Sequence, residues 1–488
     1  MSRRTPAYVS LLALLLASGC AGLPAVGPDY ERPDAPVAQA WKTEPGWQVG
    51  QPRDGELKGA WWEIFSDAQL NALQEQALTN GQTMVIAQAR VDQARAQANV
   101  ANSAFFPRIG AQAGSARNRT SAERPVTNYN TQNTSVIQND FNAAFTASYE
   151  LDLFGRVRRQ AEGARATAQQ AKADFENTRL ILTAELAVDY LVLRQTDAEI
   201  DVLQQTLAAQ TKALDFITAR HELGAASGLD FNQQQGLTAA TQTQLTLLKD
   251  QRARYQNAIA TLVGVPAPDF RLAVNLSSTS VPVIPLGAPL TLLERRPDIA
   301  AAERAMANAN AQIGVARSAY FPTLGLSGLV GSDANQIGNL FSAPALLWSI
   351  GVSATQTIFD GGRTSANVDF AKAGYQQAVA SYRQSVLVAI QEVQDGLSSD
   401  VALAQAITSA KVAADSADRS LGLSQDRYQN GITTNLEVVV AQQTFLNYRR
   451  QEVQLQGQRL VNTVRLIKAL GGGWHAPESA QARKLDKH

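Results

Sequence analysis

Residues 139–156 have the sequence NDFNAAFTASYELDLFGR. Up to residue 153 apolar and mostly polar side chains alternate, with Phe141 and Phe145 on one face and Asn142 and Glu150 on the other. A period of two is that of a β-strand with one apolar face. The proline-free segment 156–223 follows Gly155 and predicts a helix about 100 Å long. A strand therefore leads here into a helix longer than one globular domain needs.

The same arrangement occurs twice along the chain. Four landmarks recur 207 positions later, as the pairs Arg156 and Arg363, Arg220 and Arg427, Gly224 and Gly431, Leu229 and Leu436. The motifs Ala104–Pro107 and Ala319–Pro322 are 215 positions apart, so the first copy holds eight further residues, which we place in the polar stretch 117–139. Exposed loops tolerate such insertions. Each copy is expected to contain a helix, two strands, a long helix, a tight turn and a shorter helix.

The expected boundaries are similar in the two copies. The first repeat, 63–265, contains a helix, strands at about 107–119 and 139–153, and helices at 156–223 and 229–262. The second repeat, 297–474, contains a helix, strands at about 322–332 and 346–359, and helices at 363–429 and 436–470. A Pro-rich linker, 266–296, joins them, and a tail covers 475–488.

Seam residues in both long helices are spaced by alternating steps of three and four. They are Leu203, Leu207, Gln210, Leu214 and Ile217, and Val379, Tyr382, Val386, Ala389 and Val393. This heptad spacing predicts helices that pack side by side as coiled coils.

The N-terminus has the pattern of a secretory signal peptide over residues 1–19. Arg3 and Arg4 precede a short apolar run, and small residues lead to Cys20. Cys20 in this context predicts lipid attachment, with 20–62 as an extended leader; the alternative is a cleaved signal with an incidental cysteine. Several lipid chains on one cysteine would give stable attachment to membrane lipids. The residue after Cys20 is Ala21 and not Asp, which resembles the signal that sorts lipoproteins to the outer membrane.

Composition excludes several classes of protein. The 43 Lys+Arg residues balance the 43 Asp+Glu residues, so nucleic acid is not expected as a partner. A single cysteine and three histidines give no pattern for a disulfide or a metal site. The sequence has no GxSxG, P-loop or HExxH motif. We therefore expect no enzymatic activity and no cofactor.

The four amphipathic strands predict an oligomer. An open four-stranded sheet cannot face lipid, because its edge groups would have no hydrogen-bond partners, and membrane barrels need at least eight strands. Two, three or four chains sharing one barrel would supply 8, 12 or 16 strands, and the larger barrels enclose water. We expect a mixed α and β fold whose helices continue the wall of such a barrel.

Ordered motifs between Cys20 and Trp474 carry a family resemblance. They are Gly27–Tyr30, Trp61-Trp62, the paired Phe-Pro motifs, Glu294–Ile299, Phe359–Gly362 and Ala469–Trp474. The chain resembles the outer-membrane factors of the TolC/OprM family, in the lipoprotein branch that serves tripartite efflux pumps. The resemblance implies a homotrimer with a 12-stranded transmembrane β-barrel, four strands per chain, and a long α-helical coiled-coil barrel in the periplasm of a Gram-negative bacterium. It also implies two partners: a periplasmic adaptor (membrane fusion protein) and an inner-membrane transporter of the RND or a similar type.

In this family the tips of the coiled coils close the periplasmic mouth. Where the family commonly has an Asp and an Arg after the second turn, this chain has Val440 and Gln443, so that electrostatic latch does not carry over. Asp230 and Glu437 are expected to place carboxylates around the mouth, or alternatively to act as helix N-terminal carboxylates that the helix dipole favours. A ring of Val440 side chains could instead gate by dewetting.

The resemblance also implies that the two turns dock the adaptor. The residues concerned are Leu223, Gly224 and Ala225 in the first turn and Asn430, Gly431 and Ile432 in the second. Alternatively, the glycines only end their helices.

Three functions remain open from the sequence. The first is a passive outer-membrane exit duct for small molecules such as drugs or toxic metabolites. The second is an exit duct of the same architecture for type I protein secretion. The third is a lipid-anchored periplasmic coiled-coil scaffold in which the alternating segments form surface hairpins.

Overall fold

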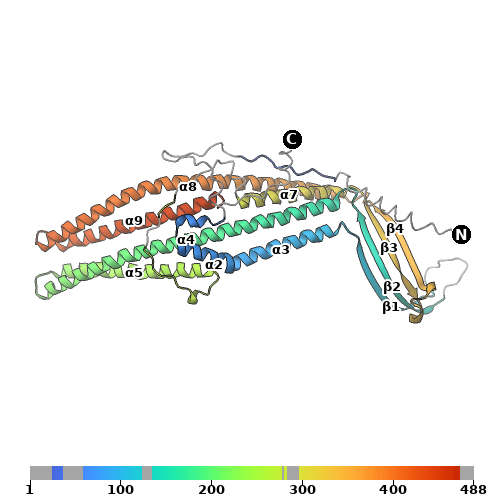
Figure 1. Ribbon diagram of the computed structural model, residues 1–488, viewed down its shortest axis with the longest axis horizontal. Coiled ribbons are helices and arrows are strands. Elements are labelled where there is room, and N and C mark those ends of the chain that lie inside the picture. Colours follow the sequence, from blue (N-terminus) through green and yellow to red (C-terminus); the bar gives the residue numbers. More distant parts are fainter. Residues whose placement is uncertain (1–24, 37–58, 124–133, 277–279, 283–295, 473–488) are drawn as a thin grey trace. The chain divides into compact units, whose positions relative to one another are not determined.

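The computed structural model describes residues 25–36, 59–123, 134–276, 280–282 and 296–472. The expected signal peptide, Cys20, most of the linker and the tail lie outside these ranges. The helices are η2 (Trp61–Phe65), α2 (Ala68–Asn80), α3 (Gln82–Ser103), α4 (Arg156–Glu222), α5 (Gly228–Leu262), η3 (Ala267–Asp269), α7 (Pro297–Ser318), η5 (Ile337–Asn339), η6 (Ala343–Ala345), α8 (Arg363–Gln429) and α9 (Asn435–Ala469). The strands are β1 (Arg108–Thr120), β2 (Val136–Leu151), β3 (Thr323–Ala334) and β4 (Leu346–Thr355) (Figure 1).

Two local features differ from the sequence expectation. The first repeat begins with η2, α2 and α3 rather than one helix. The break is at Gly81, whose extended backbone approaches Ala77 so closely that an added Cβ would lie 2.2 Å from the Ala77 carbonyl oxygen. Strand β4 ends at Thr355 rather than near residue 359, because its last partner is Thr323 and the preceding Pro322 has no N–H to continue the ladder.

The four strands form one antiparallel sheet in the order β1-β2-β3-β4. Pairing of β2 with β3 joins the two repeats. One face of the sheet carries rows of apolar side chains across all four strands, such as Ala111, Phe145, Val330 and Trp348. Phe145 is 63% exposed and Trp348 is 70% exposed. The sheet therefore presents a large uncovered apolar face, a feature of surfaces that contact a membrane or another protein.

The compact units of the chain do not coincide with its repeats. Unit 1 comprises Met1–Pro33, Asp92–Gln169 and Glu303–Ala380, and unit 2 comprises Asp34–Val91, Gln170–Ala302 and Ser381–His488. The borders Asp92 and Glu303 are 211 positions apart, as are Gln169 and Ala380. Each unit thus contains matching pieces of both repeats, and neither repeat forms a compact body alone.

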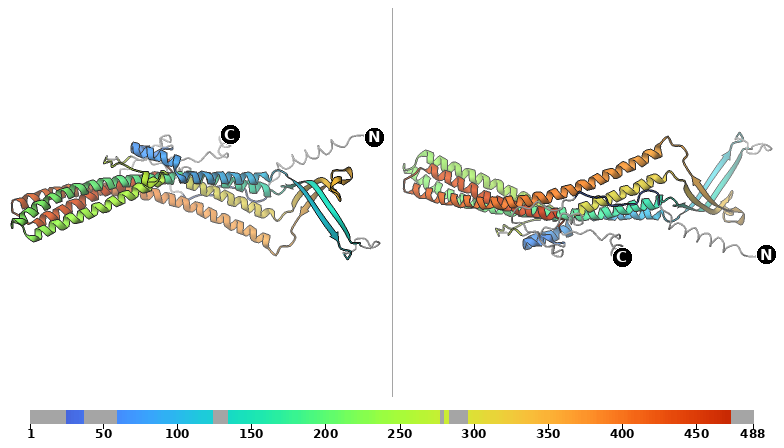
Figure 2. Two further views of the ribbon diagram at one scale, coloured as in Figure 1. Left: turned by 90° about the horizontal axis from the view of Figure 1, so that it is seen from below. Right: turned by 90° about the horizontal axis from the view of Figure 1, so that it is seen from above.

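In unit 2 the helices of both repeats lie side by side (Figure 2). A large apolar core joins η2 and α2 to α4, α5, α8 and α9 around the fully buried Tyr190. Several residues of the predicted seams are buried, as heptad packing requires; they are Leu203, Gln210, Ile217, Tyr382, Val386, Ala389 and Val393. Among the described helices, none is both long enough and apolar enough to cross a membrane.

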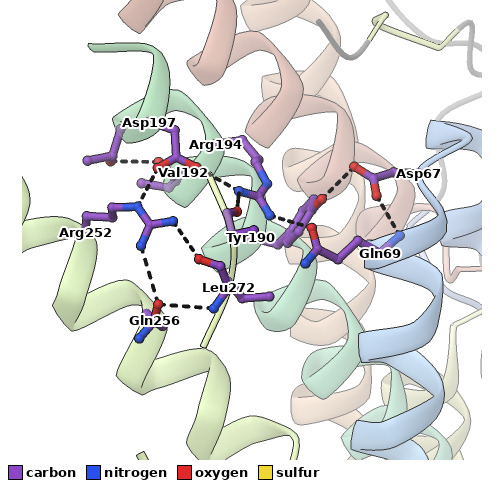
Figure 3. Close-up of polar contacts among 11 residues, drawn as sticks. Asp67, Gln69, Tyr190, Val192, Arg194, Asp197, Arg252, Gln256 and Leu272 are labelled. Carbon is purple, nitrogen blue, oxygen red and sulfur yellow. Dashed lines mark hydrogen bonds and ion pairs between the residues drawn. The ribbon is translucent and has the colours of Figure 1, made fainter. Parts of the chain in front are cut away.

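A buried ion-pair network fixes α4 to α5 (Figure 3). The side chain of Asp197 is fully buried and accepts hydrogen bonds from Arg194, at 2.7 Å, and from Arg252. Arg252 also donates to the Leu272 carbonyl, which holds the segment after η3 against the helices. A buried carboxylate shared by two guanidinium groups is stable only because all three charged groups are paired and hydrogen-bonded.

The same network reaches α2 through the side chains of Asp67 and Gln69 (Figure 3). Tyr190 donates to Asp67 at 2.7 Å, and Asp67 also accepts the backbone N–H groups of Gln69 and Leu70, which caps α2. Burial raises the pKa of Tyr190 to about 12, and its hydrogen bond to Asp67 adds to the shift. The network therefore connects α2, α4, α5 and the start of the linker.

Candidate functional site at the helix tips

The turn between α4 and α5 is closed by backbone hydrogen bonds. The Gly224 N–H donates to the His221 carbonyl at 2.9 Å, and the Ala225 N–H donates to the Arg220 carbonyl at 2.7 Å. Gly224 has a φ of +73°, a left-handed conformation that glycine adopts readily. This pair of bonds is the Schellman ending of a helix. Leu223, one of the expected docking residues, is 83% exposed beside it.

The turn between α8 and α9 repeats this geometry. The Gly431 N–H donates to the Tyr428 carbonyl at 3.0 Å, and the Ile432 N–H donates to the Arg427 carbonyl at 2.8 Å. Gly431 has a φ of +72°. Both glycines therefore end their helices, and the flanking Asn430 and Ile432 are exposed. This geometry leaves docking untested, since a helix-ending turn can also be a contact surface.

Asp230 and Glu437, expected at the mouth, have different surroundings. Asp230 forms a capping box at the start of α5: its N–H donates to the Ser227 hydroxyl oxygen at 3.1 Å, and its carboxylate accepts the Ser227 N–H at 3.3 Å. This supports the helix-terminus alternative for Asp230. In α9 the N-cap residue, Thr434, makes no side-chain cap bond, and Glu437 is exposed.

Glu437 and Val440 line a groove between α8 and α9 with a volume of about 690 Å³. Its floor on α8 consists of small residues, and Tyr448 lies at its far end on α9. Val440 is 54% exposed, and Gln443, one residue after the buried Gln442, is also exposed. The structure thus places Glu437 and Val440 together, whereas Gln443 is not part of the groove lining.

In the part of the chain that the structure describes, the tips of the two hairpins interact through a hydrogen bond and a cation–π contact. The Asn435 side chain donates to the Asp230 carbonyl at 3.3 Å. The Arg220 guanidinium lies over the Tyr428 ring, 5.9 Å from its centroid, and over the Phe216 ring at 5.7 Å. Burial raises the pKa of Tyr428, while Arg220 opposes this rise and Asp230 reinforces it.

In the sequence Arg220 is recognisable only as a landmark of the repeat, and nothing near it indicates these contacts. Tyr428 is 208 positions away from Arg220, and no local pattern indicates such a pairing. Only the capping motif at Ser227 and Asp230 has a signature that could be found in the sequence.

His221 takes part in the fold of the first turn. Its Nδ1 lies 3.0 Å from the Ala226 carbonyl oxygen, and its ring stacks on Phe231. Because a carbonyl can only accept, Nδ1 carries the proton. The expected lipidation site, Cys20, lies outside the described residues and stays a prediction.

Comparisons with known proteins give consistent results. The family model described as outer membrane efflux protein matches residues 73–265 and 288–472. The two matched segments correspond closely to the two repeats.

Individual relatives match over nearly the whole chain. The toluene efflux pump outer membrane protein TtgF of Pseudomonas putida is 31% identical over 475 residues, which cover 96% of this chain and 97% of the relative. The outer membrane protein OprJ of Pseudomonas aeruginosa is 31% identical over 477 residues, with the same coverage. The solved structure of the outer-membrane channel OprN is 30% identical, has a TM-score of 0.82, and covers 92% of this chain and 99% of its own.

Proposed function

Because the chain belongs to the outer membrane efflux protein family, we propose that it is the passive exit duct of a tripartite efflux pump and performs no chemistry of its own. The observation that carries this function is the match over both repeats, which includes the strands and the helix tips together. A coiled-coil scaffold would need only the helices. The uncovered apolar face of the sheet supports a membrane location for the strands.

We infer that the cargo consists of small organic molecules, since TtgF is named for toluene. The test is accumulation of a toluene-like fluorescent dye in cells that lack the chain and in cells complemented with it. Higher accumulation without the chain supports an efflux duct. Unchanged accumulation, together with loss of a secreted protein, would favour the protein-secretion duct instead.

The sheet supports a homotrimer that closes a 12-stranded barrel. Among the described strands, β1 and β4 each pair on one side only, which leaves two open edges with unpaired N–H and C=O groups. In lipid these groups need partners, and a neighbouring copy would supply them. The mass of the protein in mild detergent, corrected for bound detergent, tests this. A monomer would contradict the closed barrel and the duct together.

Of the two expected pump partners, the adaptor is the one that would contact the two turns. A periplasmic adaptor would dock on Leu223–Ala225 and Asn430–Ile432, and an inner-membrane transporter of the RND or a similar type would supply the energy. Leu223→Asp and Ile432→Asp each replace an exposed apolar side chain of a turn by a charge and leave the left-handed glycines unchanged. We expect both variants to assemble normally but to lose cross-linking to the adaptor and dye efflux. Full cross-linking in both would move the docking site elsewhere.

We propose that α9 lines the aperture, the narrowest part of the periplasmic mouth. Val440 would be its constricting residue and Glu437 its charged residue. Half of the Val440 surface is exposed in the groove, and hydrophobic constrictions can gate by dewetting. Val440→Asp should therefore raise the resting conductance of the purified protein in planar bilayers. Equal conductance before and after the change would remove Val440 from the gate.

A further inference from the structure

The two repeats match residue by residue in the structure. Helices α3 and α7 have 22 residues each, and their bounds are 215 positions apart. Helices α4 and α8 have 67 residues each, and their bounds are 207 positions apart. The strands follow the same offsets, since the pair of Arg108 and Ser148 corresponds to the pair of Thr323 and Thr355. Each residue of β4 or α8 therefore has a counterpart in β2 or α4, and each residue of β1 or α3 has one in β3 or α7.

One strand end departs from this equivalence. Strand β2 continues past Ser148 to Leu151, and its last three residues pair only with β3, with Leu151 opposite Leu324. The counterparts of these three residues are 356–358, but β4 ends at Thr355. Strand β3 occupies one side of β4, and none of the described strands lies on the other side. The end of β2 is thus held in the sheet by a type of neighbour that β4 does not have within one chain.

The side chains at the two free edges of the sheet match each other. Ile358, the counterpart of Leu151, is 91% exposed, and Ile109, the counterpart of Leu324, is 73% exposed. Leu151 and Leu324 lie opposite each other inside the sheet and are partly buried. The free edge of β4 therefore resembles the edge of β2 that binds β3, and the free edge of β1 resembles the edge of β3 that binds β2. The segment that fits the edge of β4 is β1 of a second copy.

The helices next to the strands carry the same match, with one difference. Gly163 of α4 faces α7, where an added Cβ would lie 3.5 Å from the Cβ of Ala311. The counterpart of Gly163 is Phe370 on α8, which is 81% exposed, and the counterpart of Ala311 is Ala96 on α3, which is also exposed. If α8 packs against α3 of a second copy, the Phe370 ring lies where the internal contact has no side chain. The contact between copies is then wider here than the internal one, and it buries an aromatic ring.

We propose that a second copy of the chain binds β4 and α8 with its own β1 and α3, in the register of the internal contact between β2 and β3. Ile358 then lies opposite Ile109 of the second copy, and residues 356–358 complete β4. The contact joins different surfaces of the two copies, so it repeats from copy to copy until a ring closes. It rests on the proposed homotrimer and names the residues that meet in it.

The same register brings an aromatic and a cationic side chain together near the other end of the strands. Phe141 of β2 lies opposite Ala334 of β3, and their counterparts are Trp348 and Arg119. Both counterparts are exposed and belong to the apolar face of the sheet. Residues directly opposite each other on one face are close enough to interact, and a guanidinium group is attracted to the face of an indole ring. Trp348 should therefore contact Arg119 of the second copy.

Cysteine pairs in the full-length protein in outer membranes test the register. Ile358→Cys combined with Ile109→Cys should link most of the protein into covalent oligomers with a short thiol-specific cross-linker, because directly opposite Cβ atoms are about 5 Å apart. The matched control combines Ile358→Cys with Ala111→Cys, which lies two residues further on the same face, at about 7–8 Å. This shifted pair should lose most of the product.

The possible results separate the register from the proposed function. A higher yield from the shifted pair would overturn the register and leave the trimer intact. Oligomers from Ile358→Cys alone would indicate a two-fold contact and would also overturn it. No product from either pair, in protein with the mass of a trimer, would contradict the binding surface. A monomeric mass would contradict the proposed function and the register together.

A second pair keeps the test decisive if changes at the strand ends prevent assembly. Val352→Cys with Ser115→Cys probes the middle of the same strands, because Phe145 and Val330, their counterparts, lie opposite each other. Its shifted control is Val352→Cys with Ala113→Cys. The same preference for the unshifted pair supports the register, and the reverse preference overturns it.

The contact between the helices has a test of its own. Phe370→Ala should lower the temperature at which the assembled protein dissociates in detergent, because it removes the ring that is buried between two copies. The matched control is Phe341→Ala, since Phe341 is 85% exposed in the connection between β3 and β4 and should not change this temperature. Gel electrophoresis of samples heated in steps measures both. An unchanged temperature for Phe370→Ala, or an equal decrease in the two variants, would contradict the place of Phe370 between the copies.

Discussion

Asp230 and Glu437 occupy matched positions in the two repeats, but their carboxylates have different surroundings. The first is bound in the capping box with Ser227, and the second lies exposed in the groove beside Val440. A carboxylate that is already hydrogen-bonded to a helix terminus attracts a passing cation less strongly than a carboxylate that faces open solvent. The duplication therefore gives two similar tips with unequal electrostatic roles.

This difference predicts unequal effects of neutralisation. Glu437→Gln should lower the cation selectivity of the purified channel, because it removes an exposed charge beside the constriction. Asp230→Asn should leave selectivity nearly unchanged, because the Asp230 charge is already bound at the helix terminus and an asparagine oxygen can still accept the Ser227 N–H. Reversal potentials in a salt gradient across a planar bilayer measure both. An equal change in the two variants would contradict the assignment of Glu437 to the aperture.

Asp189 on α4 predicts a dependence of stability on pH. Burial, and then the neighbouring Glu185, raise the pKa of Asp189 to about 6. A raised pKa means that the folded state favours the neutral carboxyl, so the stability it contributes is present below the ordinary pKa near 3.8 and is lost as pH rises through about 6.

Because Asp189 is only partly buried and water screens part of the effect, Asp189→Asn should stabilise the protein by on the order of 1 kcal/mol near neutral pH and by almost nothing near pH 4. Thermal unfolding followed by circular dichroism at both pH values measures the difference. The same gain at both values would show that burial of the charge is not the cause. Glu185→Gln should give a smaller gain with the same pH dependence.

At the scale of elements, α2, α4 and α5 depend on one buried carboxylate. Asp197 has no exposed side-chain surface and neutralises two arginines, of which Arg194 is 8% exposed. Removing one member of a buried ion pair is costly because the remaining charges stay buried without a partner.

Asp197→Asn should accordingly destabilise the fold by about 3–5 kcal/mol and lower the yield of assembled protein. The matched control is Asp250→Asn, which breaks an exposed ion pair with Arg254 on α5 and should cost less than about 1 kcal/mol. Thermal unfolding of both variants makes the comparison. Similar losses would show that the network of Figure 3 does not hold these helices together.

At the scale of the whole molecule, the apolar face of the sheet predicts direct contact with lipid acyl chains. Trp348 lies on this face and is 70% exposed, whereas Trp61 is buried in the core of unit 2. Brominated acyl chains should quench the fluorescence of the reconstituted protein, and Trp348→Phe should remove most of that quenching. Trp61→Phe is the control and should leave it intact. Quenching that persists in Trp348→Phe would place this face away from lipid.

Local patterns in the amino-acid sequence were sufficient to predict the duplicated order of elements and the two turns. Period-two alternation, long proline-free segments and glycines at Gly224 and Gly431 are local signals, because backbone geometry fixes the spacing of side chains within each element. The expected helices and strands consequently lie within a few residues of the observed ones. The prediction of a single helix before β1 was wrong. The break at Gly81 depends on the close approach of its backbone to the Ala77 carbonyl.

Tertiary packing sets which elements share a unit and which polar groups meet there. Pairing of β2 with β3, the Arg220 contact with Tyr428 and the shared carboxylate of Asp197 join residues far apart in the chain. Gln210 fits the heptad spacing whether or not its amide finds a partner, so the lack of a partner for this buried amide among the described residues has no sequence signature. Such features depend on how several helices pack at once, and periodicity within one helix carries no information about the groups that the other helices bring to it.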